Sequence, residues 1–374
     1  MTIKTKNFKE TASKILEATK VDKNAANLEI VARDTNLFLN VTNKEYFVSI
    51  KFILDEPTNF RAVVDAALFL DLIAGLTADT FDLTVKDTYI NIKANKSNYK
   101  LAMIFENDKL MELPAITIQN KTVEMPISND ILMSILNVNG KEIEKARNLD
   151  VNELQKLYYI DETGAFSFTT GACLNSFALD KPVKLLLNDR IVKLFKLFKD
   201  DVQFSLGQDP LPNGEVRSKV SFETADTYVA AYVNCDTVLL SKIQGPCDAT
   251  KRFISEKYDY NVVLSVSSLS AAISRLMLFT KNSIDKANMA MVPAVVEINA
   301  DDVILTDTLG NTETVQVENG SFVTDVYSMK VNLFDLKNVL DSCKSDHITL
   351  NCGNHRSIVI NRGTICNLIP ELRK

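Results

Sequence analysis

The chain has 374 residues, of which 46% are hydrophobic and 24% are charged, and its formal net charge is −6. This length exceeds one ordinary hydrophobic core, so two or three domains are expected. No apolar run reaches about 18 residues, which argues against a membrane-spanning helix, and the acidic balance argues against a protein that grips nucleic acid over its whole surface.

In chain order, the first third of the sequence reads as helix, strands, helix and strands. Apolar residues at helical spacing predict a helix over Phe8–Lys20, and apolar–polar alternation predicts strands over 28–42. A second amphipathic helix over 68–76 precedes further alternating strands that continue to Phe105. Such alternation is typical of antiparallel sheets with one buried face.

The same order of elements recurs in the middle and last thirds. Helices are predicted to begin at Ser128 and at Ser265 or Ser267, whose hydroxyls can accept from the unpaired amides of a first helical turn. The second helix of each copy is predicted over 191–198 and from Leu333, and an alternating strand follows each one.

The repeat length indicates whole domains. The matching strands end at Val85, Leu206 and Leu350, separations of roughly 120 and 145 residues that are too long for a solenoid. We therefore predict an α+β fold of three repeated helix-and-antiparallel-sheet domains. The predicted domains are residues 1–121, 122–250 and 251–374, with connectors near Gln119–Thr122 and within Lys242–Tyr258. A charged insertion over 140–156 is interpreted as an extended helix or a solvated excursion.

The N-terminus and the cysteines favour a cytoplasmic protein. Lysine and glutamate interrupt the first residues, so no secretory signal peptide is expected. The six cysteines are scattered without a CxxC pair, which is typical of reduced, packed thiols. His347 and His355 follow Cys343 and Cys352 at spacings of no standard zinc motif, so we expect neither a metal nor another cofactor.

Basic residues gather on one side of some predicted helices. Over Arg190–Lys199 the apolar side chains share one face and the cations the other, and the N-terminal helix is similar. The helix over Asp65–Leu76 has neither lysine nor arginine. A basic helix face is ordinarily a solvated surface, and this patchy charge suits weak phosphate contact rather than base reading. The candidate DNA-facing cations are Lys6, Lys9, Lys14, Lys20, Arg190, Lys193, Lys196, Lys199 and Arg275.

Motifs for catalysis are missing from the sequence. There is no P-loop, no GxGxxG after a strand, no GxSxG and no HExxH. Acid pairs such as Asp200–Asp201 and Asp301–Asp302 fall at predicted turns, where carboxylates favour turn geometry. We therefore expect no enzyme and no catalytic residue. A metal-dependent nucleic-acid enzyme, with carboxylates converging from several strand ends, stays an alternative.

The order of the modules and the C-terminal ending resemble the bacterial DNA polymerase III beta subunit, the DNA sliding clamp, over most of the chain. The local matches are FRAVVDAALFLDLIAGLTADTFDLTV from Phe60, FSFTTGACLNSFAL from Phe166 and NLIPELRK from Asn367. The resemblance implies a head-to-tail homodimer that closes around duplex DNA, with helices lining the hole and sheets outside. It also suggests a divergent copy from a phage.

The resemblance further implies a pocket between the middle and C-terminal domains. In the family this pocket takes short hydrophobic peptides from the polymerase, the clamp loader and repair proteins. The family has a basic dipeptide where this chain has Ala172 and Cys173, which changes the expected peptide preference. Without the resemblance, Leu174 and Ile369 would be equally well interpreted as core. The candidate pocket residues are Thr169, Gly171, Leu174, Pro246 in the second connector, Leu368, Ile369, Pro370, Leu372 and Arg373.

The resulting hypothesis is a processivity factor that tethers a polymerase to DNA in the cytoplasm of a bacterium or a phage-infected bacterial cell. A trimeric clamp of two-domain chains is a related alternative, against which the third repeat argues. A structural or scaffold protein of repeated sheet modules, with no DNA-encircling role, is the alternative from another class.

Overall fold

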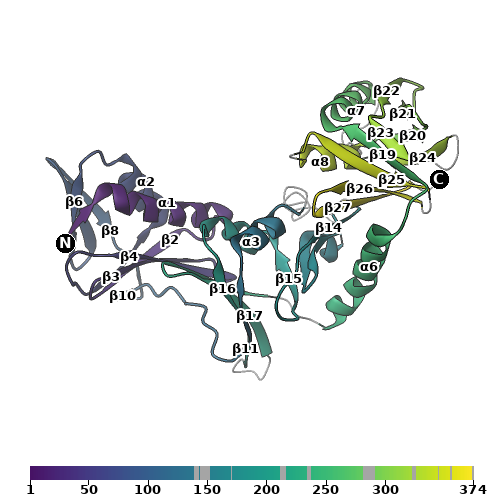
Figure 1. Cartoon of the computed structure of the whole chain (residues 1–374). Coiled ribbons are helices and arrows are strands. Elements are labelled where there is room, and N and C mark those ends of the chain that lie inside the picture. The colour runs from purple at the N-terminus through teal and green to yellow at the C-terminus, as the bar shows by residue number, and fades with distance from the viewer. Residues whose placement is uncertain are drawn as a thin grey trace. The chain divides into compact units, whose positions relative to one another are not determined.

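In the computed structural model, the chain forms two compact units, Met1–Met133 with Arg190–Asn234 and Ser134–Asp189 with Cys235–Lys374. The structure describes residues 1–138, 143, 152–169, 171–210, 216–233, 237–280, 291–321, 326–343, 345–353 and 356–372. Arg373, His355 and most of the charged insertion lie outside these ranges. The fold is α+β (Figure 1), and the paired strands run antiparallel, as the alternation predicted.

The first unit contains a four-stranded sheet in the order β1-β6-β7-β8 and an eight-stranded sheet in the order β11-β16-β17-β18-β4-β3-β2-β5. A short hairpin of β9 and β10 accompanies them. The strands are β1 Thr2–Lys4, β2 Asn27–Arg33, β3 Asn36–Thr42, β4 Tyr46–Ile53, β5 Phe60–Asp65, β6 Thr80–Val85, β7 Tyr89–Ala94, β8 Ser97–Ala102, β9 Phe105–Glu106, β10 Lys109–Leu110, β11 Lys121–Ile127, β16 Val202–Pro210, β17 Val216–Glu223 and β18 Thr227–Tyr232.

Helices α1 (Thr5–Val21) and α2 (Ala66–Gly75) lie side by side in this unit (Figure 1). The predicted apolar stripe of α1 is buried, and the ring of Phe8 meets those of Phe52, Phe69 and Phe81 edge-on. The Asp65 carboxylate accepts from the amide of Leu68 and caps α2. Helix α3 (Asn129–Leu136), α5 (Asp189–Lys193) and the 3-10 helix η2 (Leu194–Leu197) follow along the chain.

The second unit contains a nine-stranded sheet in the order β15-β12-β13-β14-β27-β26-β25-β19-β23 and a four-stranded sheet in the order β22-β21-β20-β24. The strands are β12 Leu157–Asp161, β13 Gly164–Ser167, β14 Ala172–Ser176, β15 Lys184–Asn188, β19 Tyr260–Ser265, β20 Pro293–Ile298, β21 Asp302–Asp307, β22 Thr312–Gln316, β23 Asn319–Ser321, β24 Tyr327–Asn332, β25 His347–Cys352, β26 Ser357–Arg362 and β27 Ile365–Pro370.

The helices of the second unit are the 3-10 helix η1 (Glu153–Lys156), α6 (Thr237–Ser255), α7 (Val266–Thr280) and α8 (Leu333–Asp341). The predicted caps are confirmed, because the Ser265 hydroxyl accepts from the amide of Ser268, and Ser128 does the same for Ile131 at the start of α3. Helices α7 and α8 pack together over one continuous apolar core.

The predicted internal repetition appears in the strand order. Each third of the chain supplies two groups of four strands, in which three consecutive strands form a meander and a fourth strand pairs beside its first strand; in the last third, β23 adds one more strand beyond β19. The last meander strand joins one group to the next: β4 pairs with β18, and β14 pairs with β27. Both large sheets therefore combine strands from two thirds of the sequence, which explains why three repeats pack as two compact units.

The two predicted connectors differ from one another in structure. The first is held against the eight-stranded sheet, because the Asp209 carboxylate accepts from the amides of Gln119 and Asn120. The second, predicted within Lys242–Tyr258, is mostly helical, since most of that segment belongs to helix α6. The division into domains at residues 121 and 250 remains a prediction.

Candidate functional site

Two of the candidate cations on α1 are engaged within the fold. The Lys9 ammonium donates to the main-chain oxygens of Ala74 at 2.8 Å and Leu76 at 2.6 Å, where the C-terminal end of α2 presents unpaired carbonyls. The Lys14 ammonium lies 2.8 Å from the Asp226 carboxylate. Burial alone would raise the pKa of Asp226, but the hydrogen bonds it accepts, first of all from Lys14, bring that pKa below its usual value. These lysines fix α1 in place.

The remaining α1 candidates are more exposed. Lys20 pairs with Glu17 one turn earlier, at 2.8 Å, in an exposed ion pair of the kind that contributes little to stability. Lys6 is exposed and has no ion-pair partner among the residues that the structure describes. Of the four α1 lysines, Lys6 is therefore the one with the fewest polar contacts to the rest of the described protein.

The segment Arg190–Lys199, expected as one α-helix, is instead α5 followed by the 3-10 helix η2. Its apolar residues recur at every third position, in two buried columns, which matches the three residues per turn of a 3-10 helix better than the 3.6 of an α-helix. The columns are Ile191, Leu194 and Leu197, and Val192, Phe195 and Phe198.

The remaining positions at this spacing, residues 190, 193, 196 and 199, are the four cations. Arg190 is held by Asp22 at 2.9 Å and by Glu45 at 2.8 Å, and Lys193 is half-buried. Lys196 and Lys199 are exposed and have no partner in the described part of the chain. In the second unit, Arg275 forms a two-bond pair with Glu313 of β22, at 2.6 and 2.7 Å, which joins α7 to that strand.

The structure brings the two predicted pocket segments together as paired strands. In the β14–β27 pair, Ala172 lies opposite Leu368 and Leu174 lies opposite Cys366. Gly171, just before β14, has φ 64°, and a side chain there would overlap the main-chain oxygen of Leu368. A hydrogen bond also fixes the Thr169 side chain, because its hydroxyl donates to the carbonyl of Gln155 at 2.6 Å.

The pocket candidates lie on both faces of this strand pair. Alternation places Leu174 and Leu368 on one face, with Leu174 buried and Leu368 half-buried. Ile369 points to the other face and is fully buried in the core beneath α7 and α8. Pro370 is exposed and Leu372 is half-buried, so both lie at the surface, while Arg373 is outside the described residues.

Cys173, a candidate for altered peptide preference, is fully buried opposite Asn367. Burial raises the pKa of its thiol to about 11, against the opposing effect of the nearby Arg362 guanidinium. The thiol is therefore protonated at neutral pH and acts as a small apolar group.

The sequence reasoning placed Pro246 in a connector and overlooked the helix around it. Pro246 lies inside α6 and is exposed, whereas its neighbour Cys247 and Ile243 are buried against Leu174. Apolar residues at helical spacing could have revealed α6, but the Gly245–Pro246 pair is a strong turn signal and masked it. The connector is thus a helix that covers the strand carrying Leu174.

The described residues offer little for catalysis. No group of three or more His, Cys, Asp or Glu side chains within them is placed to hold a metal ion. The carboxylate of Asp201 accepts from the amide of Asn129 at the start of α3, and Asp302 follows a turn built on Asn299, so these acids have local structural roles. His347 lies 2.9 Å from Glu318. No helix in the described ranges is both long and apolar enough to cross a membrane.

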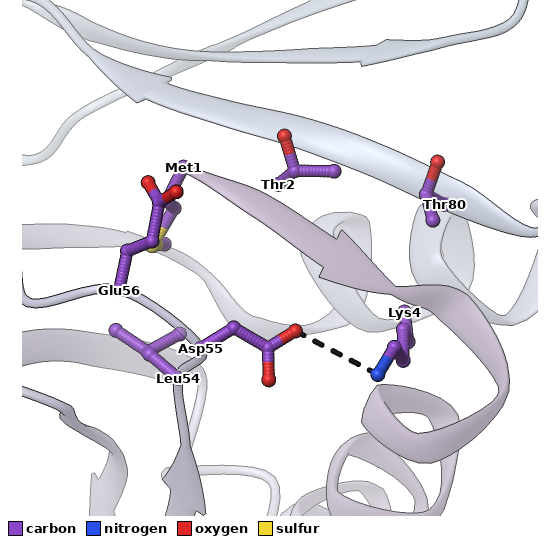
Figure 2. A pocket seen from close by; sticks show the side chains of 7 residues that line it. All are labelled: Met1, Thr2, Lys4, Leu54, Asp55, Glu56 and Thr80. Carbon is purple, nitrogen blue, oxygen red and sulfur yellow. Dashed lines mark ion pairs between the residues drawn. The ribbon is translucent and has the colours of Figure 1, made fainter.

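A polar cavity of about 240 Å³ lies at the N-terminus (Figure 2). It opens beside β1, where Lys4 and Asp55 form an exposed ion pair across 3.7 Å. The N-terminal ammonium is bonded to the main-chain oxygen of Leu83, so it belongs to the β1–β6 pair. The cavity holds no set of converging groups suited to a reaction.

No protein-family model matches the chain, and no curated protein matches it. Solved structures match over its full length. The DNA polymerase III subunit beta from Pseudomonas aeruginosa gives a TM-score of 0.77 at 14% identity and covers 100% of both chains. The beta subunit from Thermotoga maritima gives 0.73 at 16% identity, covering 100% of this chain and 99% of that one. The beta chain from Streptococcus pneumoniae gives 0.75 at 12%, with the same coverage.

The chain has the fold of a DNA polymerase III beta subunit. Because the matched structures cover 100% of this chain, all three repeats lie within the matching fold. At these identities the likeness concerns the fold alone, and the side chains of the candidate sites are this chain's own. Within the beta-subunit fold, α6 and the buried Cys173 are the features that most alter the expected pocket.

Proposed function

We propose that the chain is a non-enzymatic DNA sliding clamp, a processivity factor that closes around duplex DNA as a ring of two copies. It would act in the cytoplasm of a bacterium or of a phage-infected bacterial cell, and would tether a DNA polymerase and a clamp loader through short hydrophobic peptides. The observation that supports this proposal most strongly is how the four-strand groups pair with one another at their edge strands.

This pairing rule leaves two groups without a partner. In both large sheets, the last meander strand of one group pairs antiparallel with the last meander strand of the next, as β4 does with β18 and β14 with β27. The groups β1-β6-β7-β8 and β24-β20-β21-β22 end in β8 and β22, which are edge strands in the described structure. Applying the same rule between two copies pairs β8 of one with β22 of the other.

The side chains near these two edges support such an association. Beside β8, a cavity of about 260 Å³ is lined by residues of α2, β7, β8 and the segments that follow α2 and β7, including the half-buried Leu72 and the exposed Tyr99. Near β22, Leu278 and Phe279 at the end of α7 are more than half exposed. Exposed apolar groups beside an open sheet edge favour pairing with another chain. A head-to-tail contact of this kind closes into a ring or continues as a filament, and the beta-subunit fold favours a two-copy ring.

The distribution of free cations suits sliding. Lys6, Lys196 and Lys199 are exposed and form no ion pair within the described chain. Helices α1 and η2 pack side by side. A few such charges give weak, salt-dependent phosphate contact without base recognition. We assign them to the DNA-facing surface. A closed ring then supplies the retention that strong affinity would otherwise supply.

We assign the peptide site to the face of the β14–β27 pair that carries Leu174 and Leu368, with Pro370 and Leu372 at its border. Partly buried apolar residues of η1 and β12 extend this face, among them Leu154 and Leu157. Apolar surface beside a sheet is well suited to anchoring short peptides. The test of the whole proposal is topological: a clamp is retained on closed circular DNA and lost when that DNA is linearised.

A further inference from the structure

Helix α6 covers a row of apolar side chains in the second unit. Leu186, Tyr159, Phe166 and Leu174 lie opposite one another across β15, β12, β13 and β14, so they form one continuous line on one face of the sheet. Ile243 and Cys247 of α6 are fully buried against this row. Leu174 is only 4% exposed as a result.

Helix α6 attaches to the sheet through few fully buried side chains. Among the described side chains of α6, Ile243, Cys247 and Thr250 are fully buried, at positions i, i+4 and i+7, while Leu239, Leu240 and Ile254 pack against the same cluster and stay partly exposed. The polar contacts at its sides include the ion pair of Lys251 with Asp161 at 2.8 Å and the hydrogen bond from Lys184 to Gln244 at 3.1 Å. Elements with few fully buried side chains open locally more readily than core strands.

Two further features weaken the docked helix. Gly245 and Pro246 stand side by side in its middle, and the proline has no amide to donate to the preceding turn. Beneath the helix, the hydroxyl of Tyr159 is buried and has no hydrogen-bond partner in the described part of the chain. Lifting α6 would hydrate that hydroxyl and remove the penalty of leaving it unsatisfied.

We propose that α6 is a movable cover over the peptide site, and that a partner peptide displaces it to place apolar side chains against the Leu186–Leu174 row. This inference rests on the proposed function, because it concerns the regulation of the same peptide site. In the covered state the anchoring surface is occupied by the chain's own Ile243 and Cys247. A partner must therefore compete with α6, which lowers its apparent affinity by the fraction of molecules that are open.

A movable cover and a fixed wall predict opposite changes in peptide affinity for the same substitution. Ile243→Ala removes a contact that holds α6 down, so it tightens binding of the peptide if α6 is a cover, by roughly up to tenfold. If Ile243 is part of a fixed wall, the same change weakens binding. Lys242→Ala, on the exposed side of α6, is the matched control and leaves the affinity unchanged.

The probe is a fluorescein-labelled peptide with the C-terminal residues of the replicative polymerase from the same genome, measured by fluorescence polarisation on the full chain. Hydrogen exchange of the wild type provides a second readout that needs no variant. Displacement predicts faster exchange of the α6 amides when the peptide is bound, whereas a fixed wall predicts slower exchange.

Each experimental outcome supports or overturns a different part of the proposal. Tighter binding by Ile243→Ala with faster α6 exchange supports the cover. Weaker binding, or α6 exchange that slows with peptide, overturns the cover while leaving the peptide site intact. Absence of binding to the wild type and to Ile243→Ala alike overturns both the peptide site and the cover, and retention on circular DNA then decides separately whether the clamp proposal survives.

Discussion

Gly171 contacts the main chain of Leu368, with no room between them for a side chain. The two residues are almost two hundred positions apart in the sequence, yet they lie at one end of the β14–β27 pair. This contact connects the middle and last thirds of the chain. It also places the two segments of the candidate peptide site within one sheet.

Substituting Gly171 tests this contact. Gly171→Ala forces a side chain into the left-handed region and against the Leu368 carbonyl, so it should lower the free energy of unfolding by more than the about 1–2 kcal/mol of the backbone effect alone. Gly363→Ala is the matched control, because Gly363 has φ 66° but open space around it. Urea denaturation measures both; equal losses would show that the contact with Leu368 does not matter.

Reversing the free lysines of the 3-10 segment should weaken contact with DNA. Lys196→Glu with Lys199→Glu should lower affinity for duplex DNA at low salt and reduce the slope of log affinity against log salt by about 2. The control, Lys86→Glu with Lys181→Glu, makes the same charge change in exposed turns. A titration of labelled DNA at several salt concentrations gives the slopes. If both double variants behave alike, the assignment of the DNA-facing surface is wrong.

A charge at the end of α7 should separate the two copies. Leu278 is 59% exposed, so Leu278→Asp should fold normally but place a carboxylate in the proposed β8–β22 contact. Light scattering should then report the mass of one chain instead of two. Ile53→Asp changes a side chain of similar exposure, 58%, away from that contact and should leave the mass of two chains. A two-chain mass for Leu278→Asp would place the contact elsewhere.

The first connector should make stability depend on pH. The hydrogen bond from Lys219, together with those from the amides of Asn120 and Gln119, outweighs burial and holds the pKa of Asp209 below its usual value. The ionised carboxylate therefore stabilises the fold above its unfolded pKa of about 3.9, and this contribution is lost as pH falls through the lower folded value.

Asp209→Asn should accordingly lower the urea midpoint at neutral pH, and its difference from the wild type should shrink as the pH falls below about 4. Asp87→Asn, in an exposed turn, is the control and should change little at any pH. A difference that stayed constant from neutral to acidic pH would mean that the loss is steric rather than electrostatic.

The sequence predicted the local elements well, because their signals are local. Ser128 and Ser265 mark helix starts through hydrogen bonds to amides three residues away. Alternation located the strands, and the repeated order of elements indicated the fold. The period of three over 191–199 was also present in the sequence, but it resembles an amphipathic α-helix over so short a segment.

The candidate sites were less predictable, because they depend on partners that are distant in the chain. The charge of Arg190 is neutralised by Asp22 and Glu45, and no local pattern reveals such pairs. Leu174 and Ile369 were assigned to one pocket, and they lie on neighbouring strands, but the register shows that they face opposite sides. Helix α6 was hidden by its own Gly245–Pro246 pair, and with it the cover over Leu174.

Retention on DNA of defined topology tests the central proposal most directly. The labelled chain is loaded onto nicked circular duplex DNA with its clamp loader, separated from free protein at high salt, and one half of the sample is cut once with a restriction enzyme. A ring that encircles DNA stays with the circle and slides off the linear product. Equal loss from circular and linear DNA, or equal retention on both, would contradict the account.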